Sequence, residues 1–232
     1  MNEEAISHLK AKDKRLAKVI DAVGEIEIHQ HSDSFYFIVR EIVGQMVSAA
    51  VKKVIFDRLT AICNNNICPE TLLKLQVEDL RAIGLSNAKS QFILSLAEMV
   101  AKGNINFATL ETMSDEDVLN HLTSIKGIGN WTAKMYLLFF LQREDILPYE
   151  DGAFLQAYRW LYNTKKSDRK SIEKRCKKWK PYTSVGARYL YRALDTGLTK
   201  QPIKDFLAKE SFDKEICTET DHGVGSTDHF SR

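Results

Sequence analysis

A chain of 232 residues with 44% hydrophobic and 28% charged residues has the composition of a folded globular protein with one or two cores. Its 33 Lys and Arg nearly balance its 31 Asp and Glu, and the resulting net charge of +2 argues against a nucleic-acid partner unless the charge gathers on one face. Only 11 Gly and 4 Pro argue against an all-β sandwich, whose many turns need these residues.

The order of apolar residues along the chain predicts helices almost throughout. The first 18 residues are charged and lack the apolar stretch of a secretory signal. From Phe37 to Leu59 apolar residues recur at spacings of three and four, which is typical of helix. Only Glu25–His29 shows some alternation of a strand. Further helices are expected over 70–77, 79–83, 86–100, 114–122, a segment after Gly129, and 151–162, 168–179, 185–194 and about 202–209.

Two features of the chain bear on its compartment. The longest apolar run, from Met135 to Leu141, is about a third of the length that a membrane span needs. The cysteines form no C-x-x-C pair, so neither a zinc site nor an iron–sulfur cluster is expected, and reduced thiols in the cytosol are the favoured interpretation. These cysteines are Cys63, Cys68, Cys176 and Cys217.

Two segments depart from the average charge. Residues 165–180 hold nine Lys and Arg against Asp168 and Glu173. Such a run is more often a solvated helix face than a contact with DNA. The last residues, 211–232, hold five acids against Lys214 and Arg232 and few apolar residues, so the tail 214–232 is expected to be disordered.

The segment from Leu122 to Leu141, LTSIKGIGNWTAKMYLLFFL, reads as a helix, a tight turn and a second helix. Gly127 and Gly129 stand in the turn, and Asn130 is expected to cap the second helix. Glycines let a backbone approach a ligand closely, and the N–H groups at the helix start suit a phosphate. A plain helix–helix turn with two capping glycines is the alternative.

The full pattern, L-x-x-I-K-G-I-G-x-W-T-A, resembles the helix–hairpin–helix of DNA repair glycosylases. The resemblance covers about residues 35–194 and is closest to the alkylpurine branch, that of 3-methyladenine DNA glycosylase II. Four further segments carry it: Phe37–Ser48 (FIVREIVGQMVS), Leu80–Ala97 (LRAIGLSNAKSQFILSLA), Leu147–Asp151 (LPYED), and Lys180–Tyr182 with Ala187–Tyr189.

This resemblance implies an all-α fold of two helical lobes with a DNA-binding cleft between them. The central lobe spans 35–143 and includes the hairpin at 114–141, and the second combines 1–34 with 144–213. The implied function is a monofunctional DNA glycosylase of base excision repair, which flips alkylated purines such as 3-methyladenine out of the helix and hydrolyses their N-glycosidic bond.

Three departures from the family pattern refine this expectation. Glycosylases with lyase activity carry a Lys where this chain has Trp131, so no Schiff base with the sugar is expected. The residues before the match are too few for the β-domain of the bacterial alkylpurine enzymes. The usual Pro before the first hairpin glycine is Lys126, a possible further phosphate contact.

Asp151 is the candidate catalytic residue by its position in the family pattern. An N-alkylated purine is cationic and leaves readily, so a carboxylate that stabilises the oxocarbenium-like sugar and orients water is sufficient. Taken alone, Asp151 is better explained as a helix N-cap, and it is the hairpin upstream that favours catalysis; Glu150 is the competing acid.

A cationic base is expected to stack on electron-rich rings, for which the candidates are Trp131, Tyr191, Phe35 and Tyr36. Each is equally consistent with core packing, although Tyr191 falls where the family places a stacking aromatic. Met46 is the candidate wedge that fills the gap left by the flipped base, with core packing nearly as favoured. The expected DNA contacts are Gly127, Gly129, Lys126, Thr132, Gln45, Met46 and Ser48.

By resemblance, the main-chain carbonyls of Thr123, Ile125 and Ile128 are expected to hold a structural Na⁺ or K⁺, while the chemistry needs no cofactor. The expected partner is double-stranded DNA with damaged bases, bound by a monomer without a membrane. In a bacterium the expected location is the cytoplasm, in association with the nucleoid. In a eukaryote it is the nucleus. The alternatives are a non-catalytic helix–hairpin–helix DNA-binding protein and a glycosylase for another damaged or mismatched base.

Overall fold

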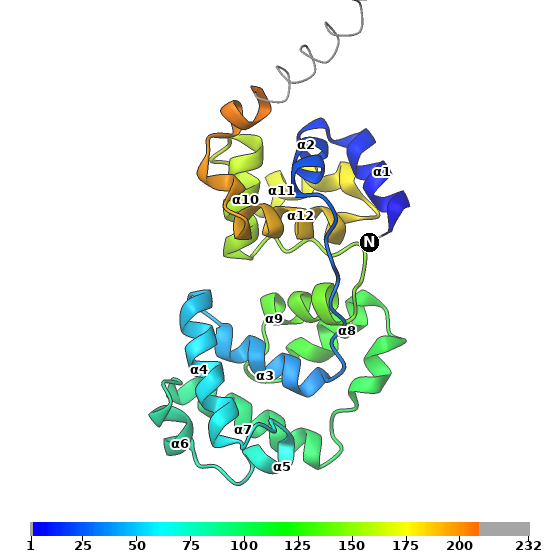
Figure 1. The fold of residues 1–232 in the computed structure, drawn as a ribbon. Coiled ribbons are helices and arrows are strands. Elements are labelled where there is room, and N and C mark those ends of the chain that lie inside the picture. The colour runs from blue at the N-terminus through cyan, green and yellow to red at the C-terminus, as the bar shows by residue number, and fades with distance from the viewer. Residues whose placement is uncertain (1, 209–232) are drawn as a thin grey trace, which may run out of the picture. The chain divides into compact units, whose positions relative to one another are not determined.

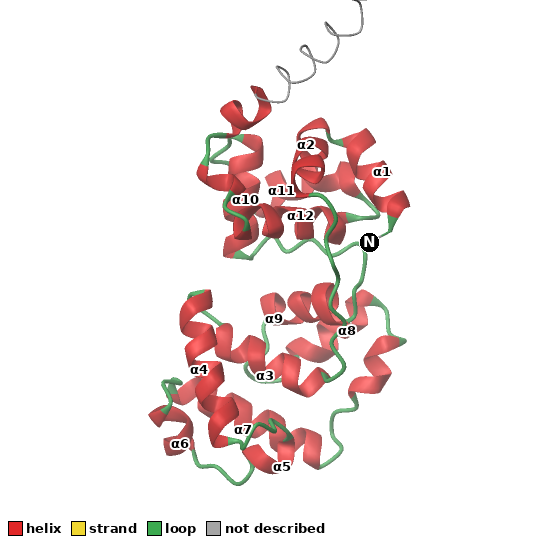
Figure 2. Cartoon of the chain, viewed as in Figure 1, coloured by secondary structure: helices red, strands yellow, loops and turns green. Residues whose placement is uncertain are grey.

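The computed structural model describes residues 2–208, which form helices joined by loops and contain no strand (Figure 2). The all-α fold expected from the periodicity is confirmed. Glu25–His29, the segment with strand-like alternation, lies in a loop. The tail 214–232 lies outside the described residues. None of the helices within 2–208 is long and apolar enough to cross a membrane.

The chain divides into two compact units. Within the described residues, unit 1 combines residues 2–26, 149–180 and 185–208, and unit 2 combines Glu27–Pro148 and Pro181–Ser184. Residues 27–34 and 144–148 therefore lie with the central part of the chain, not with the N-terminal and C-terminal parts as expected. A hydrogen bond helps to explain why residues 144–148 belong to unit 2, because the Ser184 N–H donates to the carbonyl of Glu144 at 2.9 Å.

Unit 1 packs its helices around a core of large apolar side chains. Leu9, Leu16, Phe154 and Trp179 are fully buried there. Its elements are α1 (Glu3–Lys12), α2 (Lys14–Val23), α10 (Gly152–Tyr162), α11 (Arg169–Cys176), η3 (Lys177–Trp179), most of α12 (Thr183–Asp195) and η4 (Leu198–Lys200) (Figure 1).

Unit 2 is built on the buried helix α3, whose residues Ile38, Val39 and Ile42 have no exposed surface. An aromatic cluster of Phe37, Tyr136 and Phe140 joins α3 to η2. The elements of unit 2 are α3 (Ser34–Gly44), α4 (Ala49–Ile62), α5 (Pro69–Leu72), α6 (Val77–Ala82), α7 (Asn87–Ala101), η1 (Phe107–Glu111), α8 (Asp115–Thr123), α9 (Asn130–Met135) and the π-helical η2 (Tyr136–Phe140) (Figure 1).

The periodic segment from Phe37 to Leu59 is two helices, not one. Helix α3 ends at Gly44, and Ser48 caps α4 by accepting a hydrogen bond from the Val51 N–H at 3.3 Å. Between them Met46 has φ +56°, which a continuing helix does not allow. A short loop, residues 45–48, therefore interrupts the two helices, and we call it the wedge loop.

Candidate functional site

The hairpin of unit 2 joins α8 to α9 through a turn that only glycine can make at one position. Gly127 has φ +94°, and a Cβ built there would lie 2.3 Å from Cγ of Phe92. Gly129 is different, because its φ is −97° and nothing lies within 4 Å of such a Cβ. It is Gly129, not Asn130 as expected, that takes the cap position of α9, since Asn130 already has helical geometry as the first residue.

The exposed part of the hairpin turn combines main chain with polar side chains, among them one lysine. Lys126, Gly129 and Asn130 are exposed, as a contact with a phosphate requires. Thr132, an expected DNA contact, is only 1% exposed. Its hydroxyl accepts a hydrogen bond from Nε2 of Gln45 at 3.0 Å, so it serves the packing of the hairpin rather than its outer surface.

The side chain of Gln45 ties the wedge loop to the hairpin. Its Nε2 donates to the Gly127 carbonyl at 2.9 Å as well as to Thr132. The sequence predicted Gln45 only as a direct contact to DNA. The structure instead gives its amide a role between two parts of the candidate interface.

Lys89 on α7 holds the same loop from the other side, and sequence reasoning missed it. Its Nζ donates to the carbonyls of Val43 at 2.9 Å and Gln45 at 2.6 Å. Burial lowers the pKa of Lys89. Its position in the Leu80–Ala97 segment was the available signal, because an otherwise apolar helix face there carries a lysine.

Met46 stands fully exposed at the tip of this braced loop. Its side chain has a relative exposure of 101%, and its backbone is left-handed with φ +56°. Core packing, the competing interpretation of Met46, is therefore wrong. An unbranched apolar side chain that projects into solvent from a fixed backbone has the form of a wedge for base steps. Ser48, also exposed, ends the loop as the cap of α4.

The candidate catalytic carboxylate lies in unit 1 at the start of α10. Asp151 caps this helix, and one carboxylate oxygen accepts a hydrogen bond from the Phe154 N–H at 2.7 Å. Asp151 is 9% exposed, whereas its neighbour Glu150 is exposed. The two acids thus differ in exposure, since Asp151 is largely shielded from solvent and Glu150 is not.

The candidate base-pocket rings fall into different environments. Phe35 is 5% exposed, so it belongs to the core and is wrong as a surface for a base. Tyr36 is 37% exposed and packs edge-on against Phe56. Tyr191 of α12 lies against Phe154, the residue whose N–H orients Asp151. Trp131 is half-buried in the first turn of α9.

The residues expected to hold a monovalent cation lie where α8 ends. Thr123 is the last residue of α8, and Ile125 and Ile128 follow in the turn. The carbonyl of Ile125 accepts the N–H of Ile128 at 3.0 Å, which closes the turn. Among residues 2–208 no group of three or more His, Cys, Asp and Glu could hold a metal ion, and Cys63, Cys68 and Cys176 form no disulfide.

Comparison with known proteins places the chain in a family. The model of the HhH-GPD superfamily base excision DNA repair protein matches residues 39–181. Among curated proteins, DNA-3-methyladenine glycosylase 1 of Schizosaccharomyces pombe is 28% identical over 85% of this chain and 90% of its own length. The alkylbase DNA glycosidase-like protein mag2 of the same organism is 29% identical over 82% and 92%.

Solved structures of similar proteins point to the same family. DNA-3-methyladenine glycosidase of Bacillus halodurans is 31% identical, covers 88% of this chain and 95% of its own, and superposes with a TM-score of 0.73. The Schizosaccharomyces pombe enzyme Mag1, in complex with abasic DNA, is 28% identical over 82% and 96%, with a TM-score of 0.75. The resemblance seen in the motifs is confirmed: the chain belongs to the HhH-GPD superfamily of base excision DNA repair proteins.

Proposed function

We propose that the protein is a monofunctional DNA glycosylase that releases alkylated purines, with 3-methyladenine as the representative substrate. Relatives that align with most of this chain carry 3-methyladenine glycosylase names. The observation that carries the proposal is the buried, oriented carboxylate of Asp151 at the start of α10. Its hydrogen bond to Phe154 is that of a helix N-cap, and the match of residues 39–181 to a family of base excision repair proteins is what favours a catalytic role for it.

The chemistry follows from the charge of the substrate. When the N-glycosidic bond of an alkylated purine breaks, its electron pair leaves with the base, which thereby loses its positive charge. The sugar carbon is left with oxocarbenium character, which the Asp151 carboxylate stabilises. Water then adds to this carbon and gives up a proton, for which Asp151 is the acceptor. No redox step or cofactor enters this balance.

The wedge loop and the hairpin would supply the contacts that hold flipped DNA. Met46 enters the base stack, while Lys126 and the main chain around Gly127 and Gly129 meet the phosphates, with Ser48 at the end of the loop. Gln45 supports these contacts from behind. The candidate rings for stacking on the cationic base are Trp131, Tyr36 and Tyr191, because cation–π stacking contributes up to about 2 kcal/mol when desolvated.

A Na⁺ or K⁺ at the hairpin fits the atoms available. Main-chain carbonyl oxygens are ligands that monovalent cations take, and the Ile125 oxygen, which accepts the Ile128 N–H, keeps a second lone pair. The proposed ligands are the carbonyls of Thr123, Ile125 and Ile128. When bound, the ion would add positive charge beside the phosphates.

We further propose that the protein acts as a monomer on damaged double-stranded DNA, wherever the cell keeps its genome, in the nucleus or the cytoplasm. Trp131 at the position of the lyase lysine supports hydrolysis without strand cleavage. Borohydride reduction tests this point directly, because only an enzyme that forms a Schiff base becomes trapped on its DNA. We expect no trapped product.

The experiment that tests the function is base release by the purified protein from duplexes that each carry one damaged base. The panel contains 3-methyladenine, 7-methylguanine, 8-oxoguanine and a mismatch. We expect release of the alkylated purines alone. Release of only an oxidised or mismatched base would replace the proposed substrate class, and DNA binding without any release would support the non-catalytic alternative.

A further inference from the structure

Unit 1 carries a basic pocket that the proposed reaction does not use. The pocket lies at the other end of α10 from Asp151. It has a volume of about 600 Å³. Two basic runs of the sequence meet there, one at residues 10–18 and the other at 165–180. Five basic side chains and a single carboxylate line it: Lys12, Asp13, Lys14, Arg15, Tyr162, Arg175 and Lys178.

The one carboxylate in the wall is occupied by the protein itself. Asp13 is 2% exposed. Lys178 forms an ion pair with it at 3.0 Å, so the negative charge is both buried and balanced. Its two oxygens accept hydrogen bonds from the Arg15 N–H, the Leu16 N–H, the Tyr162 hydroxyl and the Trp179 indole N–H. The charge that the pocket presents to solvent is therefore strongly positive.

Two of the remaining cations are held in place before any ligand arrives. The guanidinium of Arg175 lies 4.6 Å from the ring centre of Tyr162, and Nη1 of Arg15 donates to the carbonyl of Leu161 at 3.2 Å. A guanidinium has five N–H donors, so each keeps donors for an anion. Because their rotamers are already restricted, binding costs less conformational entropy. Lys12 and Lys14 are exposed at the rim.

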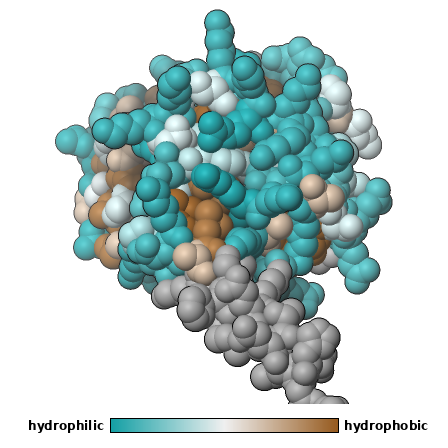
Figure 3. Space-filling view, turned by 90° about the horizontal axis from the view of Figure 1, so that it is seen from above, coloured by the Kyte–Doolittle hydropathy of each residue, from teal (hydrophilic) through white to brown (hydrophobic). Residues whose placement is uncertain are grey.

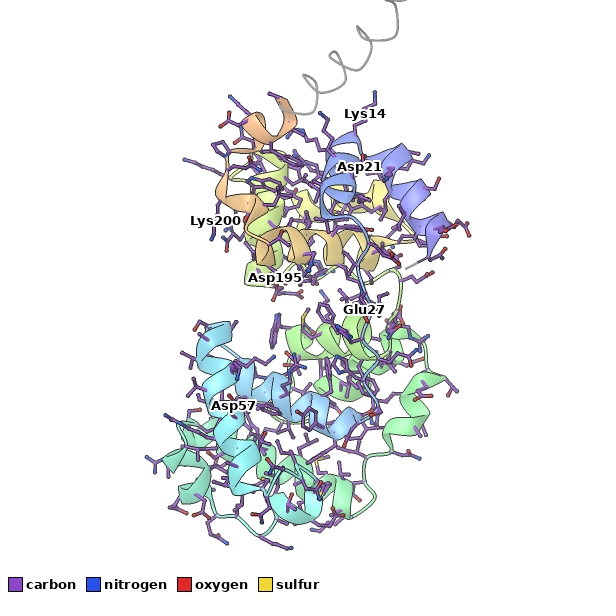
Figure 4. The ribbon with its side chains drawn as sticks, in the orientation of Figure 1. Lys14, Asp21, Glu27, Asp57, Asp195 and Lys200 are labelled. Atoms are coloured by element: carbon purple, nitrogen blue, oxygen red, sulfur yellow. The ribbon has the colours of Figure 1, made fainter. Side chains whose placement is uncertain are left out.

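The pocket and the candidate catalytic group lie at opposite ends of α10. Asp151 caps the start of this helix, and Tyr162 is its last residue, which separates them by about 16 Å along the axis. Figure 4 places Lys14 at the upper end of unit 1, and Figure 3 looks down on that end, where the visible surface is mostly hydrophilic.

A row of lysines extends the positive surface beyond the pocket. Lys170, Lys174 and Lys177 follow at spacings of four and three along α11 and η3, so they share one helix face. All three are exposed, while Ile172 and Cys176 on the other face are buried. Helices α11 and η3 therefore contribute Arg175 and Lys178 to the pocket and also carry a row of exposed lysines beside them.

We propose that this pocket and its lysine row bind the phosphodiester backbone of duplex DNA as a second site, separate from the hairpin. A series of cations fits a repeating array of phosphates better than one small anion. This inference rests on the proposed function in one respect, which is that DNA is the partner. Its consequence is that undamaged DNA is held by unit 1 with a strong dependence on salt, which keeps the enzyme close to its substrate.

The test is binding of an undamaged duplex, measured by fluorescence anisotropy over a range of salt concentrations. Lys12→Gln with Lys14→Gln is compared with Lys200→Gln with Lys204→Gln, which removes the same charge from exposed positions of unit 1 that do not line the pocket. We expect the pocket variant to reduce the slope of log K against log salt by about two, and the control to match the wild type.

The indole N–H of Trp179 gives a local readout, because it donates to Asp13 in the pocket wall. Its NMR resonance should shift when undamaged duplex is added to the wild type, and less in the pocket variant. Equal slopes for both variants, or a Trp179 shift with tripolyphosphate but not with DNA, would overturn the proposal. Should the double variant unfold, the single variants Lys12→Gln and Lys14→Gln, each expected to reduce the slope by about one, serve instead. Base release is not involved, so this result stands apart from the proposed function.

Discussion

Gly127 is the residue on which the shape of the hairpin depends most directly. Its φ of +94° and the 2.3 Å distance from a built Cβ to Phe92 exclude any side chain. We expect Gly127→Ala to lower the free energy of unfolding by about 2 kcal/mol or more. Gly129→Ala is the matched control, because its φ is −97° and its surroundings are open. Urea unfolding of both variants measures the difference, and equal stabilities would contradict the account.

Asp13 is the residue that gives the stability of unit 1 a dependence on pH. Burial alone would raise its pKa, but hydrogen bonds from Tyr162, Trp179 and Lys178 outweigh burial and lower the pKa. A carboxyl group whose pKa is lower in the folded state stabilises the fold above its ordinary pKa. This stabilisation is lost as the pH falls through the folded-state pKa.

Asp13→Asn should therefore lower the free energy of unfolding by about 3 kcal/mol near neutral pH, and the difference from the wild type should shrink in acid. Asp21→Asn removes an exposed carboxylate that pairs with Lys10 and should cost less than about 1 kcal/mol. Urea titrations at both pH values decide the matter. A cost for Asp13→Asn that stays constant into acid would show that its charge is not what stabilises the fold.

At this scale the sequence predicts residue identities better than residue environments. Asp151 was found from motif spacing, but that it is buried and Glu150 exposed depends on the packing of α10. Thr132 was expected to contact DNA, and Phe35 was weighed equally as a stacking ring and as a core residue; both are buried. Their burial results from contacts with residues far along the chain, which local spacing does not reveal.

Among the elements, the wedge loop shows how an exposed feature gains a fixed conformation. Lys89→Met would remove two hydrogen bonds from a charged donor and should lower the free energy of unfolding by about 2 kcal/mol. Met46→Ala truncates a side chain with no buried surface, so it should change the free energy of unfolding by less than about 0.5 kcal/mol. Thermal unfolding compares them, and a larger loss for Met46→Ala would refute this division of roles.

The helices themselves were largely predictable, because apolar spacing reports the buried face. The break at residues 45–48 was not, since apolar residues continue through it in helical register. The contacts that hold the loop after α3 come from residues distant in the sequence, because Lys89 anchors the loop to α7 and Gln45 anchors it to the hairpin. Caps were predictable where the side chain itself makes the bond, as for Ser114, and not at Gly129, where main-chain geometry decides.

For the whole molecule, the net charge of +2 conceals an uneven distribution. Basic residues gather at the end of α1 and on α2, α11 and η3, while residues 214–232 carry four acids against Lys214 and Arg232. Removing residues 214–232 should strengthen the binding of DNA at low salt, and this gain should vanish at high salt. Anisotropy at two salt concentrations tests it, and unchanged affinity at low salt would mean that the tail does not screen the binding surface.

Family membership was predictable from the combined spacing of several motifs, whereas the division into units was not predictable to the residue. Its boundaries follow hydrogen bonds such as that between Ser184 and Glu144, which join segments about forty residues apart in the sequence.

The central claim is that Asp151 carries out base release, and its most direct test is single-turnover release of 3-methyladenine by Asp151→Asn. Asparagine caps a helix as well as aspartate does, so the fold and the binding of abasic DNA should persist. The rate should fall by about 100-fold or more, whereas the neighbouring change Glu150→Gln should leave it within a few fold. Full activity of Asp151→Asn would contradict the account, and loss of activity in Glu150→Gln would then point to the neighbouring acid.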